Sequence, residues 1–93
     1  MRLVAAFRGE ARCQREGGVV QWRLIGRDRD GEGTLQVLLC GAASLQLPAQ
    51  LPAAELYVRD ERTAPAWELR SGERVLPLTA RAVQVHRGAA AGF

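Results

Sequence analysis

The cationic side chains are the residues of this chain best suited to bind a ligand. All 13 basic residues are arginine, and lysine is absent. The planar guanidinium group matches phosphate and carboxylate oxygens in a bidentate geometry, which the lysine ammonium group does not. The 10 acidic residues are interleaved with the arginines, so the net charge is only +3. The composition therefore permits an anionic partner without requiring one, and a GC-rich coding bias accounts for the same abundance of arginine.

Five of the arginines follow a two-residue spacing that would place them on strand faces. If the first two strands pair, these side chains form one basic stripe, which is a footprint of nucleic-acid binding. A solvated face, in which Glu10 and Glu16 pair with the arginines, explains the same pattern. The stripe consists of Arg2, Arg8 and Arg12 on the first strand and Arg23 and Arg27 on the second.

Aromatic side chains beside such a stripe would stack bases in a nucleic-acid-binding barrel. The alternation of apolar and polar residues assigns Phe7 and Trp22 to the core. Tyr57 and Trp67 remain as the candidates for stacking.

Catalytic and metal-binding residues are scarce. The single histidine, His86, has no neighbouring serine or cysteine in a nucleophile motif, so we expect no enzyme activity. Cys13, Cys40 and His86 supply at most three nitrogen or sulfur ligands, and their spacing matches no zinc site. In the acidic loop that begins at Asp28, Leu39 occupies the twelfth position, where a calcium loop needs glutamate. We therefore expect neither a metal nor a cofactor.

Two-residue alternation runs through most of the chain and predicts short β-strands. It places one set of side chains in a shared core: Phe7, Trp22, Leu24, Leu35, Val37 and Leu39. Six or seven strands in 93 residues predict an all-β fold, a small antiparallel barrel or roll of the OB-like or PH-like kind. Residues 1–87 would form this single domain, and residues 88–93 a flexible tail or the start of a truncated C-terminal helix.

Local signals predict where several strands begin, end and pair. Pro48 and Pro52 predict a crossing loop or helical turn over 49–54, followed by a strand from Glu55 to Asp60. Ser71-Gly72 predicts a two-residue turn. That turn would pair Arg70 with Glu73 and Trp67 with Leu76. Pro77 predicts an edge strand or a break in the strand, because proline cannot donate to a central ladder.

Targeting signals are weak in this sequence. Arg8 interrupts the first apolar run after five residues, which is shorter than the core of a signal peptide. No stretch is long enough for a transmembrane helix. We therefore expect a cytoplasmic protein with no membrane contact, in which both thiols stay reduced.

Together these features predict a non-catalytic interaction module that binds a protein partner or associates with itself. Apolar residues on the outer strand faces, Val4, Ala6, Val19 and Ile25, would provide such a contact. The alternative is binding of single-stranded nucleic acid or a nucleotide through the arginine-rich strand face.

Overall fold

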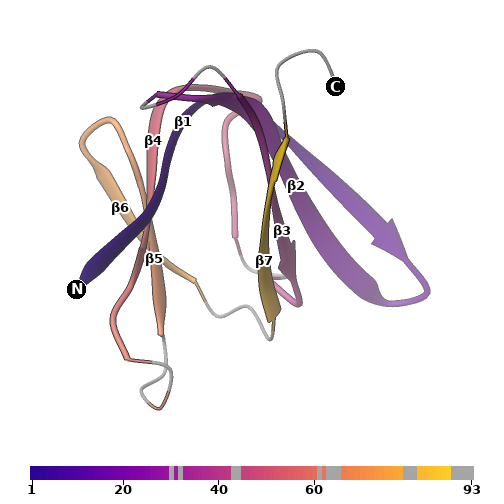
Figure 1. The fold of residues 1–93 in the computed structure, drawn as a ribbon. Helices are drawn as coiled ribbons and strands as arrows, with labels where there is room; N and C mark the ends of the chain where they lie inside the picture. Colours follow the sequence, from indigo (N-terminus) through magenta and orange to yellow (C-terminus); the bar gives the residue numbers. More distant parts are fainter. Residues whose placement is uncertain are drawn as a thin grey trace.

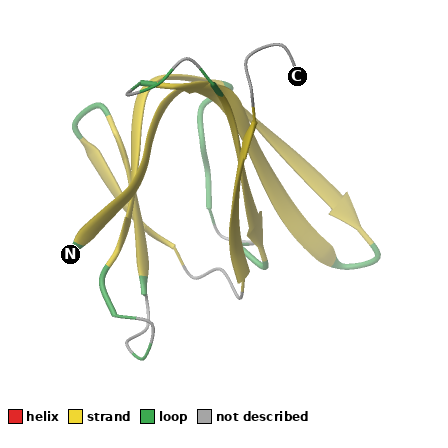
Figure 2. Cartoon of the chain, in the orientation of Figure 1, coloured by secondary structure: helices red, strands yellow, loops and turns green. Residues whose placement is uncertain are grey.

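An antiparallel sheet of seven strands makes up the described part of the chain, which comprises residues 1–29, 31, 33–42, 45–60, 62, 66–78 and 82–88 of a computed structural model. All of its regular structure is strand (Figure 2). The strand order across the sheet is β6-β5-β4-β1-β2-β3-β7. The strands are β1 (Arg2–Glu16), β2 (Val19–Asp28), β3 (Thr34–Cys40), β4 (Gln50–Val58), β5 (Trp67–Ser71), β6 (Arg74–Leu78) and β7 (Ala82–Gly88).

The long strand β1 joins the two halves of the sheet. Its residues 7–16 pair with β2, and its residues 2–10 pair with β4 on the other side. The sheet arches so that β5 and β6 lie on one limb and β3 and β7 on the other (Figure 1). A two-residue turn connects β1 to β2, with φ of 56° at Gly17 and 78° at Gly18. Glycine at both central positions is what the I′ turn of a tight hairpin requires.

The core fills the concave side of the arch. All six side chains that the alternation assigned to a shared interior are 7% exposed or less, so that prediction is confirmed. The second half of the chain adds Leu51, Leu56, Leu69 and Leu78, each almost fully buried. Ala42 and Leu45 contribute from the connection between β3 and β4. The convex face carries most of the charged side chains, together with exposed Leu3, Val19 and Val75.

The hairpin of β5 and β6 turns one residue later than its sequence predicted. The turn residues are Gly72 and Glu73, so Arg70 lies opposite Val75 and Trp67 lies opposite Leu78. The reason is conformational: a turn at Ser71-Gly72 would need positive φ at a serine, whereas the observed turn has its one positive φ, 62°, at Gly72. The predicted pairing of Arg70 with Glu73 was therefore wrong.

Strand β4 begins earlier than expected. Residues 50–54, assigned to a loop or helical turn, belong to the strand. A bulge reconciles this strand with its proline: Phe7 pairs with Ala54 and Gly9 with Leu51, so Arg8 faces the two residues between them. Proline is tolerated at a bulge because the ladder is already interrupted there. The partner that overrides the proline signal is β1, which is distant in sequence.

The sheet does not close into the predicted barrel. β6 and β7 are its two edges and are not hydrogen-bonded to each other. The edge position that Pro77 predicted for β6 is confirmed. OB-like and PH-like topologies stay predictions from strand counting. Gly88 is the last residue of β7, and the predicted tail beyond it lies outside the described residues.

Candidate arginine-rich binding face

The two-residue turn at Gly17-Gly18 sets the register that brings the arginines together. In the β1–β2 ladder Arg8 lies opposite Arg27, and Arg12 lies opposite Arg23. Because Phe7 and Leu24 point into the core, these four side chains project from the convex face. Directly opposed residues on one face have Cβ atoms about 4.5–5.5 Å apart. We call these four side chains the arginine face.

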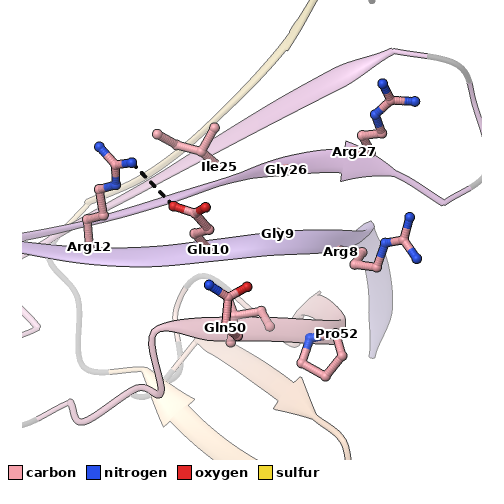
Figure 3. A pocket seen from close by; sticks show the side chains of 10 residues that line it. Arg8, Gly9, Glu10, Arg12, Ile25, Gly26, Arg27, Gln50 and Pro52 are labelled. Carbon is pink, nitrogen blue, oxygen red and sulfur yellow. Dashed lines mark hydrogen bonds and ion pairs between the residues drawn. The ribbon is translucent and has the colours of Figure 1, made fainter.

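A surface hollow of about 740 Å³ lies along the arginine face. Figure 3 shows Arg8 and Arg27 at one end of it and Arg12 at the other. Gln50 and Pro52 of β4 form the wall across β1 from β2 (Figure 3). A smaller hollow of about 340 Å³ is lined by Arg8, Arg27, Asp28, Arg29 and Pro52, so the charged surface continues past the end of the first hollow.

Carboxylates neutralise little of this positive charge. Glu10 Oε2 lies 3.3 Å from Arg12 Nη2, and the two side chains are 50% and 69% exposed. An exposed pair of this kind contributes at most about 1 kcal/mol. Among the described residues, no carboxylate lies within ion-pair distance of Arg8, Arg23 or Arg27. Arg23 Nε is moreover buried without a hydrogen-bond partner.

The arginine face is energetically unfavourable for the folded protein by itself. Like charges directly opposite each other in a sheet destabilise it, by up to about 1 kcal/mol for a pair. The β1–β2 ladder holds two such pairs, one two residues before Glu10 and the other two residues after it. Desolvation of the Arg23 Nε–H without a partner adds to the penalty. A bound anion would relieve the repulsion between the arginines.

Two other arginines have structural roles at the ends of β2 and β7. Arg29 donates from Nη2 to the carbonyl of Ala54 at 3.2 Å, and the same nitrogen lies 3.6 Å from Glu55 Oε2. Arg87 donates from Nη2 to the carbonyl of Val4 at 2.6 Å. Its Nε lies 3.6 Å from Asp28 Oδ2. These contacts tie the limbs of the arch together. Arg29 also lines the smaller hollow beside Arg8 and Arg27, whereas Arg87 lies opposite buried Leu35 and does not belong to the binding face.

The remaining predicted binding residues lie apart from the arginine face. A bulge between Leu3 and Ala5 puts Arg2 in register with buried Val58, so Arg2 is not in the row of Arg8 and Arg12. Trp67 lies opposite Leu78 and packs against the core.

Tyr57 is in register with Leu3, five residues along β1 from Arg8, which is about 16 Å at the rise of a strand. Its ring is already covered by the Arg70 guanidinium, 4.5 Å from the ring centroid. Of the predicted residues, the structure therefore brings together four arginines and neither aromatic.

Polar side chains outside the predicted stripe also lie on this convex face. Gln14 lies opposite Gln21, and Gln36 of β3 lies between Ile25 of β2 and His86 of β7. The next row across β1, β2, β3 and β7 consists of Arg12, Arg23, Leu38 and Gln84. The amides are an additional supply of hydrogen-bond donors and acceptors. Only the β3–β7 register reveals the contribution of β7.

The predicted outer apolar patch is not continuous. Ala6 is buried and Val4 packs partly against the core, whereas Val19 is 52% exposed near the β1–β2 turn. Ile25 is half-buried and lines the arginine hollow.

Two glycines hold the backbones of the arginine ladder unusually close. Gly9 lies opposite Gly26. A Cβ on Gly26 would clash with the Arg8 carbonyl oxygen, and a Cβ on Gly9 would clash with the carbonyl oxygen of Ile25. Neither position accepts a side chain without movement of the backbone, so this glycine pair fixes the spacing between the strands at the hollow.

No other class of site emerges from the described residues. They contain no group of three or more His, Cys, Asp or Glu side chains placed to hold a metal ion. They also contain no helix of the length and apolarity needed to cross a membrane. No protein-family model, curated protein or solved structure matches the chain. Function must therefore be inferred from the site geometry.

Proposed function

We propose that this protein is a non-catalytic module that binds single-stranded nucleic acid on the arginine face. The observation that carries the proposal is the opposition of Arg8 to Arg27 and of Arg12 to Arg23 on an exposed ladder. Phosphate oxygens would bridge guanidinium groups that otherwise repel one another.

The amide-rich surroundings favour nucleic acid over an acidic protein. Gln14, Gln21, Gln36 and Gln84 lie on the same face as the arginines. The carboxylates of an acidic peptide would use only the arginines. The edges of nucleic-acid bases would in addition form hydrogen bonds with the glutamine amides. A single strand also suits a convex sheet, because reading a duplex requires an element that enters a groove.

The absence of aromatic side chains from the described arginine face determines the kind of binding. Base stacking supplies about 1–3 kcal/mol per base in typical single-strand binders. Tyr57 is covered by Arg70, and Trp67 is turned toward the core. Phosphate contacts must then supply most of the affinity, so we expect moderate affinity, a strong salt dependence and little sequence preference.

The direct test is fluorescence anisotropy of the full chain with labelled oligo(dT) and oligo(U), titrated at several salt concentrations. Four phosphate contacts give a slope of about −3 for log K against log salt on single strands. Replacement of Arg8, Arg12, Arg23 and Arg27 by Gln should abolish the binding and the slope together.

Arg74→Gln provides the control for general loss of charge. Arg74 is exposed on β6, at the opposite side of the sheet, so its replacement should leave the slope unchanged. Polyglutamate and a blunt DNA duplex serve as competing polyanions. Equal binding of polyglutamate, or no oligonucleotide binding at low salt, would contradict the proposal.

The cellular setting and the lack of catalysis are part of the same proposal. Cys13 and Cys40 are free thiols, as expected for a protein of the reducing cytoplasm. His86 lies on the convex face opposite Gln36. The cysteine of the same ladder, Cys40, pairs with Ala82, four residues along β7. A binding role requires no general base at this position.

A further inference from the structure

The two edges of the open sheet differ in how they are protected against pairing with another strand. An exposed edge offers unpaired N–H and C=O groups, and proline or unpaired charge normally blocks it. β6 carries Pro77, the last residue but one of its five-residue ladder with β5. β7 is seven residues long and contains no proline. Only β7 is therefore open to a further strand along its whole length.

The charge on β7 does not protect its edge either. Its one arginine, Arg87, folds back toward Val4 and Asp28, so the cation is directed away from the free edge. Gln84 and His86 are exposed on the convex side. Val83 and Val85 are only partly buried and pack at the margin of the core. A strand added beside β7 would complete the burial of these two valines.

The sequence of β7 is complementary to itself in antiparallel register. Centred on Val85, all seven residues pair: Val85 meets Val85 of a second copy, and Gln84 meets the second His86. Ala82 meets the second Gly88, and Val83 meets the aliphatic part of the second Arg87. Val83 and Val85 stay on the concave side with the stem of Arg87, and Gln84 and His86 stay on the convex side, as antiparallel pairing requires.

We propose that two copies of this chain form a symmetric dimer by pairing their β7 strands. The interface is isologous, so it closes after two copies, and Pro77 disfavours further pairing at the β6 edge. A two-fold axis normal to the sheet keeps both convex faces on the same side. The two arginine faces then form one surface, with their β2 strands five strand spacings, about 24 Å, apart. The second copy thus lengthens the surface available to a polyanion.

Sedimentation equilibrium without nucleic acid tests the dimer independently of the proposed function. Seven paired residues make a small interface, so we expect a concentration-dependent shift from 10.1 kDa toward twice that mass. The double variant Gln84→Arg/His86→Arg places arginines opposite arginines across the dyad and should remain monomeric. Both positions are exposed, so circular dichroism should show an unchanged fold.

The matched control adds the same two charges elsewhere, as Gln46→Arg/Val19→Arg at exposed positions outside β7, with residue 19 opposite Glu16, and should still dimerise. Register is tested in a Cys13→Ser/Cys40→Ser background by oxidising an equal mixture of Gln84→Cys and His86→Cys chains. The mixed disulfide should exceed either homodimer. A wild-type chain that stays monomeric, a dimer that survives the double-arginine change, or no excess of mixed disulfide would overturn the proposal.

Discussion

Two regions of the convex face carry arginines and place them in opposite environments. On β4 and β5, Arg70 Nε lies 2.7 Å from Glu68 Oε2, and its guanidinium covers the Tyr57 ring. The hydrogen bond to Glu68 raises the pKa of Arg70. On β1 and β2, Arg8 faces Arg27 and Arg12 faces Arg23. Among the described acidic residues, only Glu10 forms an ion pair with one of these four, Arg12.

This contrast distinguishes arginines that stabilise the fold from arginines available to a ligand. In the first region each charge has a partner inside the molecule, so an anion gains little by binding there. In the second region the charges repel, and an external anion gains the interactions that the protein lacks. Arginine content alone does not separate the two regions; the pairing partner of each side chain does.

The largest effect should come from the backbone that sets the arginine ladder. In Gly26→Ala, the new Cβ would clash with backbone atoms of Arg8 and Gly9, which neither strand can avoid without moving. We expect a loss of about 1–3 kcal/mol, as for other overpacked sites. Urea denaturation measures it. In the control Gly31→Ala the nearest atoms are 4.0 Å away, and stability should change by less than about 0.5 kcal/mol. Equal stability of the two variants would show that the close approach is unimportant.

A smaller effect is expected when the acid in the hollow is neutralised. Glu10→Gln removes the partner of Arg12 and leaves the amide in the same place. Oligonucleotide affinity should rise up to about fivefold, the equivalent of a surface ion pair of at most about 1 kcal/mol. Anisotropy titrations at constant salt measure the change. Glu73→Gln, on the exposed turn before β6, should leave affinity unaltered, and a fall in affinity for Glu10→Gln would count against phosphate binding here.

The smallest effect is expected from replacement of Arg70, which has partners inside the protein. Arg70→Gln loses the contacts with Glu68 and Tyr57, so Tm should fall slightly while oligonucleotide affinity and its salt slope stay the same. Differential scanning calorimetry and anisotropy together check both halves of this expectation. If Arg70→Gln weakened binding as strongly as a change on β1 or β2, the distinction between the regions would be lost.

The core and half of the site follow from local sequence patterns. The six central core residues follow from alternation, because one face of each strand is buried. The two-glycine turn fixes the β1–β2 register, and counting outward from it places Arg8 opposite Arg27. These features depend only on residues close together in the chain.

The rest depends on pairings between distant strands, which no local pattern encodes. The bulge near Val4 removed Arg2 from its expected row, and β4 brought Gln50 and Pro52 to the hollow. The β3–β7 register added Gln84 to the face. The failure to close into a barrel has the same origin, since closure depends on the two edges meeting.

The most direct test of the account is a paired measurement of stability and affinity in Arg8→Gln/Arg27→Gln. Removal of the opposed charges should raise the free energy of unfolding, by up to about 1 kcal/mol at low salt, because the repulsion is gone. The same variant should bind oligo(dT) more weakly and with a shallower salt slope, since two phosphate contacts are lost. Stability and affinity moving in opposite directions is the predicted result. A variant that loses stability, or that binds as tightly as the wild type, would contradict it.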